Sequence, residues 1–270
     1  MTEQFEHITS PANARLRSLR RWHSRAQRER DNVVVIEGED LVAAALDAGL
    51  AVRWLLIDHS RAQDVHELAA RVDSSRVATI TTAMLADVSE LAYPPRVIAA
   101  CDRPAFQANV SPQSPRIVLD GVHDPGNVGT LIRTAVALGV GVVLLPGSAD
   151  PWSGKALRAA MGATFRAHLV RSGTCADACE DASCVVGLDA QAQVAIWDVQ
   201  LGAAPTIVVG SERDGLSAQA RGCVTHPCAI PFQDAGSESL NAGVAGSMAI
   251  YEWARQVAVL DPMHGEGGAP

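Results

Sequence analysis

Short runs of β-branched and other apolar residues alternate along the chain with segments of helical periodicity. This alternation limits the possible folds more than any other feature of the sequence. In the second half, such runs predict strands at 117–119, 142–145, 167–170, 184–187, 206–209 and 228–231. Helical patterns fill most of the gaps between them. Alternation of this kind is typical of a parallel sheet with helices on both faces. We therefore expect an α/β chain whose C-terminal part is a mostly parallel, doubly wound sheet.

The first hundred residues show the same alternation on a smaller scale. A helix is predicted at 11–30, with Ser10 as its N-cap and Pro11 at its first position, and strands and helices alternate after it. Residues 105–115, rich in Pro, Ser and Gln, lack periodicity and are interpreted as a linker. A chain of 270 residues has room for about two domains. We expect a small α/β domain at 1–104, a sheet domain at 116–258 and a disordered tail at 259–270.

The net charge of −8 argues against a uniformly basic nucleic-acid binder, but arginines are concentrated near the N-terminus. The segment "NARLRSLRRWHSRAQRER" sets seven of them against Glu29 alone. Such a local patch can bind phosphates through counterion release even on an acidic protein. A solvated helix face is the alternative, and because Lys155 is the only lysine, the arginines also fit a compositional bias. The clustering favours a nucleic-acid partner, bound by Arg17, Arg20 and Arg21.

The six cysteines do not form the paired C-x-x-C spacing of a metal site, so we expect no bound metal. No apolar run approaches the roughly 20 residues that a membrane helix needs. The first residues, "MTEQFEHITS", contain no apolar core of a signal peptide. We therefore expect a cytoplasmic protein with reduced thiols and no membrane partner.

Three segments of the second half place polar residues directly after predicted strands, where open α/β sheets bind their ligands. In the first, "IVLDGVHDPGNVGTLIRTAVALG", a strand ends at Asp120 and a loop leads into a helix at about 128–138. Gly126 and Gly129 do not complete the G-x-G-x-x-G pattern, so a dinucleotide site is weakly supported. Arg133 lies in the early turns of this helix, and a plain surface position is the alternative reading of it.

The second and third segments are "TIVVGSERDGLS" and "SESLNAGVAGSMAIYEW". In the second, four polar residues follow a strand that ends at Gly210, which indicates a site loop or a solvated turn. In the third, Ser239 or Asn241 starts a helix of small residues. Such a helix end presents free N–H groups that can hold a polar ligand group. The small residues allow close packing against another helix or passage through a tight loop, although an ordinary capped core helix is the alternative.

In this order, the three segments resemble the signature motifs of the SpoU (TrmH) family, which belongs to the SPOUT class of RNA 2'-O-ribose methyltransferases. The first motif matches through Asn127, Gly129 and Arg133. The second usually reads Gly-Asn-Glu-Gly-x-Gly, and here Ser211 and Arg213 replace an Asn and a Gly.

The third motif matches through "IP" at 230–231 and "SLN" at 239–241. The N-terminal pattern "ITSPANARLRSLRRW…VVVIEGEDLVAAAL" also resembles the family's L30e-like RNA-substrate-binding domain. The resemblance therefore covers nearly the whole chain.

The resemblance implies a deep trefoil knot, made by a C-terminal segment that passes through a loop, and a homodimer formed through the C-terminal domain. It also implies S-adenosylmethionine as the cofactor, held in a bent form mainly by backbone groups. The cofactor-binding residues carried over are Leu188, Gly210, Ser211, Ile230, Ser239 and Leu240.

The implied activity is methylation of a ribose 2'-hydroxyl of RNA, and of rRNA in particular because the L30e-like domain usually accompanies rRNA enzymes. The catalytic residues carried over are Arg133, Asn127, Glu212, Ser239 and Asn241. Because a guanidinium stays protonated, we expect Arg133 to clamp a phosphate and orient the hydroxyl rather than to act as the base. The RNA phosphate, Glu212 or water then takes the proton of the hydroxyl. The alternative role of Glu212 is structural, in which it ties the loops together. Arg158 matches a family position near the RNA-facing surface.

Two other functions stay open at this point. A Rossmann-type oxidoreductase needs a true glycine fingerprint and an acidic residue about 20 positions beyond it. A catalytically inactive RNA-binding protein with the same fold fits the altered second motif.

Overall fold

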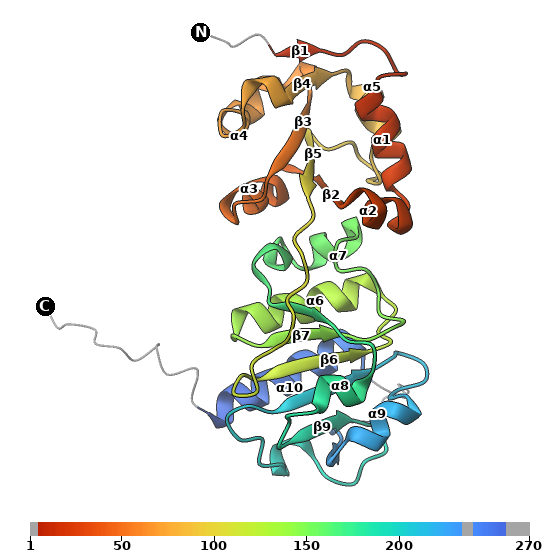
Figure 1. Ribbon diagram of the computed structural model, residues 1–270, viewed down its shortest axis with the longest axis vertical. Helices are drawn as coiled ribbons and strands as arrows, with labels where there is room; N and C mark the ends of the chain where they lie inside the picture. Colours follow the sequence, from red (N-terminus) through yellow and green to blue (C-terminus); the bar gives the residue numbers. More distant parts are fainter. Residues whose placement is uncertain (1–4, 234–239, 258–270) are drawn as a thin grey trace, which may run out of the picture. The chain divides into compact units, whose positions relative to one another are not determined.

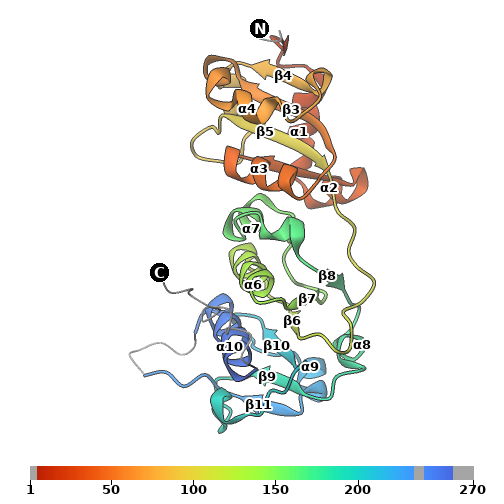
Figure 2. The same ribbon diagram turned by 90° about the vertical axis from the view of Figure 1, so that its left-hand side faces the viewer.

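The computed structural model describes residues 5–233 and 240–257. These residues form two compact units, and most of their elements are labelled in Figure 1, with β8, β10 and β11 labelled in Figure 2. The first unit comprises Met1–Ala105 and Asp150–Arg166, and the second comprises Phe106–Ala149 and Ala167–Pro270. The domain boundaries expected from the sequence stay a prediction.

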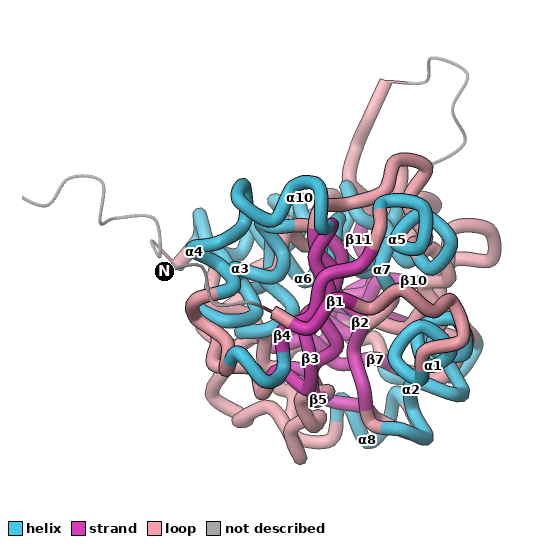
Figure 3. Tube along the Cα trace, turned by 90° about the horizontal axis from the view of Figure 1, so that it is seen from above, coloured by secondary structure: helices cyan, strands magenta, loops and turns pink. Residues whose placement is uncertain are grey.

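A mixed five-stranded sheet in the order β1-β4-β3-β5-β2 forms the centre of the first unit. Its strands are β1 (Glu6–His7), β2 (Val33–Glu37), β3 (Val52–Asp58), β4 (Val77–Ile80) and β5 (Val97–Asp102). β1 and β3 run parallel to β4, whereas β5 runs antiparallel to β2 and β3. The helices are α1 (Ala14–Trp22), α2 (Arg25–Asp31), α3 (Glu39–Asp47), α4 (His66–Ala69), α5 (Thr82–Val88) and α7 (Gly154–Ala159). Figure 3 shows helices on both sides of the strands.

The prediction of one continuous helix over 11–30 is wrong, because α1 ends at Trp22 and α2 begins at Arg25. The cap of α1 is Asn13, whose side chain accepts the N–H of Arg15, so Ser10 and Pro11 lie before the helix. The leucines of α1 pack into the core against β4 and β5.

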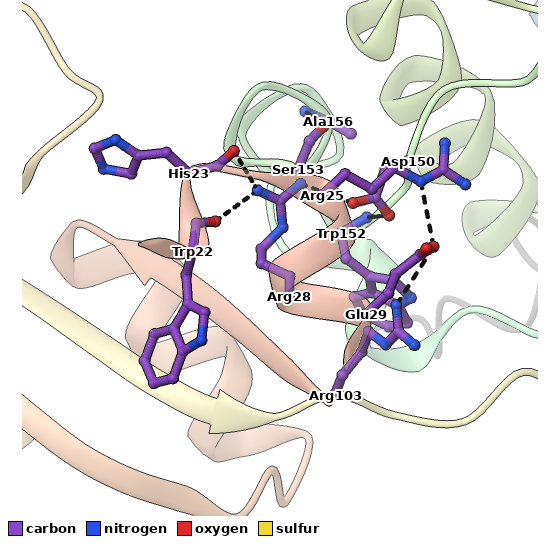
Figure 4. Close-up of polar contacts among 10 residues, drawn as sticks. All are labelled: Trp22, His23, Arg25, Arg28, Glu29, Arg103, Asp150, Trp152, Ser153 and Ala156. Carbon is purple, nitrogen blue, oxygen red and sulfur yellow. Dashed lines mark hydrogen bonds and ion pairs between the residues drawn. The ribbon is translucent and has the colours of Figure 1, made fainter. Parts of the chain in front are cut away.

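Arg28 explains the break between α1 and α2 (Figure 4). Its Nη1 donates to the carbonyl oxygens of Trp22, at 2.8 Å, and of His23, at 3.0 Å. Its Nη2 donates to Asp150 Oδ2 at 2.8 Å, and Asp150 Oδ1 accepts the N–H of Trp152. The side chains of Arg28 and Asp150 are only 8% and 5% exposed. This ion pair therefore joins the end of α1 to the turn before α7.

Replacing Arg28 by Met is expected to lower the free energy of unfolding by about 3 kcal/mol, because it leaves the buried carboxylate of Asp150 without its cation. Chemical denaturation followed by tryptophan fluorescence measures the change. Arg25 is a matched control on the same helix, since it pairs with Glu29 at a half-exposed position. Arg25→Met should shift stability by about 0.5 kcal/mol or less. Equal shifts for the two variants would contradict a special role for Arg28.

An all-parallel six-stranded sheet in the order β11-β9-β10-β6-β7-β8 forms the centre of the second unit. Its strands are β6 (Arg116–Asp120), β7 (Gly141–Leu144), β8 (Leu169–Arg171), β9 (Val185–Leu188), β10 (Thr206–Gly210) and β11 (His226–Cys228). The predicted α/β class with a mostly parallel C-terminal sheet is confirmed, and the strands lie within three residues of their predicted bounds.

Two pairs of helices cover this sheet, one pair on each face (Figure 2). α6 (Pro125–Ala137) and α10 (Ala242–Gln256) pack together on one face, and α8 (Cys175–Cys179) and α9 (Ala218–Cys223) lie on the other. A Cβ at Gly246 of α10 would lie 2.4 Å from a methyl carbon of Leu131 on α6. The small residues predicted to allow close packing therefore let α10 approach both α6 and the sheet.

Candidate functional site

A cavity of about 280 Å³ lies where β9, β10 and β11 end. Its walls include five of the six residues predicted to bind a cofactor, namely Leu188, Gly210, Ser211, Ile230 and Leu240. The sixth, Ser239, lies outside the described residues. The parallel sheet brings these residues together because the C-terminal ends of its strands meet at one edge.

The loop after β10 folds tightly back on its own strand. Ser211 and Gly215 exchange two backbone hydrogen bonds of 3.0 and 3.1 Å, and Gly215 has φ +65°. A Cβ at Gly210 would lie 2.1 Å from the carbonyl carbon of Gly215 and 2.4 Å from the nitrogen of Leu216. Gly210 therefore permits the loop to close over the end of β10. Ser211 Oγ accepts the N–H of Asp214 at 3.0 Å, so the serine stabilises this turn.

Asn127 and Glu212 join the loops after β6 and β10. Asn127 lies in the first turn of α6, which begins at Pro125 because Asp124 caps it. The Nδ2 of Asn127 donates to Glu212 Oε1 at 2.7 Å, and the N–H of His123 points to Glu212 Oε2 at 3.4 Å. Asn127 is buried, so the Asn127–Glu212 pair fixes the relative position of the two loops.

The pKa of Glu212 is lowered by these contacts. Burial alone raises it, but the hydrogen bonds from Asn127 and from the backbone N–H groups of Glu212, His123 and Asp124 outweigh burial. Glu212 is therefore ionised at neutral pH and is a weak proton acceptor. Of the two roles expected for Glu212, proton acceptor and link between the loops, the arrangement favours the link between the loops.

The start of α10 meets the same loops. Asn241 is the N-cap, and its side chain accepts the N–H of Val244 at 3.1 Å. A Cβ at Gly243 would lie 3.0 Å from Asn127 Oδ1, so the first turn of α10 lies directly against Asn127. The structure thus brings Asn127, Glu212 and Asn241 into one region at the edge of the cavity.

Arg133 lies apart from this cluster. It is exposed on α6, six residues beyond Asn127, and makes no polar contact with any residue in the described part of the chain. Within the described residues, no contact joins Arg133 to Asn127, Glu212 or Asn241, and Ser239 lies outside those residues.

The residues predicted to bind RNA lie in the first unit. Arg20 pairs with Asp87, and Arg21 lies 4.0 Å from Asp31. Arg17 is exposed on α1, and no acidic partner for it is found within 5–233 and 240–257. Arg158 is half-buried on α7, where its guanidinium lies against Gly154. Acidic neighbours thus reduce the positive charge of the predicted patch.

Asp189 and Arg221 also line the cavity, although no sequence motif pointed to them. Arg221 Nη1 donates to Asp189 Oδ2 at 3.0 Å, and its Nε donates to the carbonyl oxygen of Leu216. Asp189 is the first polar residue after β9, and this position at a strand end is a sequence signal from which it could have been predicted. Arg221 gives no such signal, because it lies inside a short helix.

Within residues 5–233 and 240–257, no three His, Cys, Asp or Glu side chains are grouped so that they could hold a metal ion. None of the described helices is long and apolar enough to cross a membrane.

Comparison with known families identifies the family of the chain. Residues 114–251 match the model of the SpoU rRNA methylase family, and residues 13–99 match that of the MRM3-like substrate binding domain. The chain therefore belongs to the SpoU rRNA methylase family.

Individual relatives agree with this assignment. The chain is 28% identical to the 23S rRNA (guanosine(2553)-2'-O)-methyltransferase RlmP of Bacillus subtilis, over 92% of this chain and 98% of that protein. It is also 28% identical to a 23S rRNA (uridine(2479)-2'-O)-methyltransferase of Streptomyces viridochromogenes, over 94% of each. The crystal structure of the SpoU methyltransferase AviRb from the same organism, in complex with AdoMet, superposes with a TM-score of 0.81 at 27% identity. That superposition covers 91% of this chain and 98% of AviRb.

Proposed function

We propose that this protein transfers a methyl group from S-adenosylmethionine (AdoMet) to a ribose 2'-hydroxyl of rRNA. The observation that carries the proposal is the cavity at the strand ends, whose walls come from the loops after β9 and β10 and from the chain before α10. The family assignment and the relatives that methylate 23S rRNA support the reaction and the substrate class.

The residues around the cavity fit AdoMet. Leu188, Ile230 and Leu240 provide apolar walls for an adenine ring, and Asp189 can accept hydrogen bonds from ribose hydroxyls. Glu212 places a negative charge at the cavity wall, which favours a cationic ligand. Ser239 completes the set of residues that we propose to hold AdoMet.

When bound, AdoMet supplies a methyl group on a positively charged sulfur. The chain's own groups then orient the nucleophile. We assign Arg133 to a phosphate of the target nucleotide, because a guanidinium makes two parallel hydrogen bonds to phosphate and positions the neighbouring ribose. Asn127, held by Glu212, together with Ser239 and Asn241, supplies orienting hydrogen bonds. Glu212 ties the loops and stays ionised.

We further propose that the C-terminal segment forms a trefoil knot. The close approach of α10 to α6 and β10, which Gly243 and Gly246 permit, supports this topology. We retain the domain boundaries 1–104, 105–115, 116–258 and 259–270, and a cytoplasmic location, as proposals.

A homodimer through the second unit is also proposed. α10 exposes an apolar row of Val244, Met248 and Tyr251, and these residues border a groove that includes the half-exposed Trp197. Apolar side chains at spacings of four and three residues lie on one face of a helix, and a two-fold contact would bury this face.

Tyr251→Arg should convert the dimer to a monomer, because a charge on the apolar face would be buried without a partner. Light scattering at micromolar concentration should give about twice the chain mass of 28.3 kDa for the unmodified protein and the chain mass for the variant. Tyr93→Arg is the matched control, since Tyr93 is exposed in the first unit. An unmodified protein that is already monomeric would refute the proposal.

The N-terminal arginines are proposed to supply RNA affinity. Changing Arg17, Arg20 and Arg21 together to Ala should weaken rRNA binding and reduce the slope of log affinity against log salt by up to about 3. Arg17→Ala alone should weaken rRNA binding at least as much as Arg20→Ala does. The reason is that Arg20 must break its ion pair with Asp87 before it can bind a phosphate. Fluorescence anisotropy over a salt series measures both effects. Unchanged affinity of the triple variant at low salt would show that the patch is only a solvated face.

The function is tested by incubating the protein with rRNA and methyl-labelled AdoMet, followed by nucleoside analysis. Label should appear in a 2'-O-methylnucleoside. Calorimetric titration with AdoMet and with NAD separates this function from a Rossmann-type oxidoreductase. AdoMet binding without methyl transfer to any rRNA would instead indicate an inactive RNA-binding protein.

A further inference from the structure

His123 lies in the loop between β6 and α6, and a backbone carbonyl fixes its ring. Its Nδ1 is 2.8 Å from the carbonyl oxygen of Gly147. A carbonyl oxygen can only accept a hydrogen bond, so Nδ1 carries the proton. In the neutral ring, Nε2 then has the free lone pair of a base.

The surroundings of the ring hold it in place without covering it. Gly121 and Gly147 have φ of +67° and +88°, and their turns bring the backbone against the ring. The ring carbon Cε1 lies 3.9 and 3.6 Å from where a Cβ would stand at these two glycines. The side chain as a whole is exposed. The ring is thus oriented by the backbone on one side and open to a ligand on the other.

The backbone of His123 contacts a residue of the cavity wall. Its N–H points to Glu212 Oε2 at 3.4 Å, and Glu212 lines the cavity. Asn127, which we assign to orienting the substrate, lies four residues further along the same loop and helix.

Three other groups near His123 are less suited to accept the proton. Arg133 stays protonated. Both carboxylate oxygens of Glu212 accept hydrogen bonds, and the pKa of Glu212 is lowered. Asp124 Oδ1 accepts the N–H of Asn127 as a helix cap.

We propose that His123 is the general base of the methyl transfer, accepting the ribose 2'-hydroxyl proton at Nε2. This inference rests on the proposed function. The O–H proton passes to Nε2 as the 2'-oxygen bonds to the methyl carbon, and the methyl–sulfur bond breaks with its electron pair on sulfur. The products are a 2'-O-methyl ribose, a neutral thioether and a protonated imidazole, so charge is conserved.

The test compares His123→Gln, His123→Ala and His168→Gln. A glutamine amide can still donate to the Gly147 carbonyl but cannot accept the proton. His168 is the matched control, because it also bonds a backbone carbonyl, that of Asn109, but it precedes β8 and so lies at the opposite edge of the sheet. Single-turnover transfer should fall about 100-fold in His123→Gln and stay normal in His168→Gln. Added imidazole should restore part of the rate of His123→Ala, which a merely structural role would not allow.

Two readouts are independent of turnover. Nitrogen-15 NMR of the free protein above neutral pH should show Nδ1 of His123 protonated and Nε2 unprotonated. AdoMet and rRNA affinities of the His123 variants should stay within about threefold of the unmodified protein, because the proposed role concerns the chemical step.

Near-normal transfer by His123→Gln would overturn the proposal, as would absence of imidazole rescue, protonation at Nε2 or loss of rRNA binding. Failure of the unmodified protein to methylate any rRNA would instead reject the proposed function. The NMR result would still report on the tautomer.

Discussion

Arg133→Ala is expected to slow methyl transfer to rRNA by at least about 100-fold, the cost of losing one strong contact made in the transition state. Arg133 is exposed on α6 and does not line the cavity proposed to hold AdoMet, so AdoMet should still bind within a few-fold. Single-turnover kinetics measure the first effect and calorimetry the second.

Arg133→Lys distinguishes two explanations of that loss. An ammonium is a point charge and cannot reproduce the two parallel hydrogen bonds of a guanidinium. We therefore expect Lys to rescue transfer poorly. Normal transfer by the Lys variant would show that charge alone matters, and near-normal transfer by the Ala variant would remove Arg133 from the mechanism.

Gly210→Ala is expected to lower AdoMet affinity by more than about 100-fold, because small displacements of positioning groups can have effects of this size. The added Cβ would lie between 2.1 and 2.4 Å from backbone atoms of Gly215 and Leu216. Backbone atoms cannot rotate aside, so the whole loop that lines the cavity must move. Calorimetry with AdoMet measures the loss.

Gly222→Ala is the control for this substitution in the same unit. Gly222 lies on the exposed surface of α9, with nothing within 4 Å of an added Cβ. Its variant should bind AdoMet normally. Threefold or smaller changes for both variants would contradict the assignment of the loop after β10 to the cofactor.

The sequence predicted the second unit well because its signals are local. Each strand is a short apolar run followed by polar residues, and parallel topology brings the strand ends to one edge. For this reason Leu188, Gly210 and Ile230, far apart in the sequence, line one cavity. Several contacts depend on tertiary structure and left no local signal. The ion pair of Arg28 with Asp150 joins residues 122 positions apart and breaks a helix that periodicity alone made continuous.

The same limit applies to charge and to proton transfer. The sequence shows seven arginines but not the carboxylates that fold against them, such as Asp87 beside Arg20. It shows His123 but not the Gly147 carbonyl that fixes its ring. Residue patterns predicted which residues make up the site. They did not predict which of its polar groups pair with one another.

The most direct test of the account is a map of 2'-O-methyl groups in rRNA from ribosomes made with and without this protein. We expect one ribose methyl group to disappear without the protein. The unmodified chain should restore it, and the Arg133→Ala chain should not. An unchanged map, or a missing methyl group on a base instead of a ribose, would contradict this expectation.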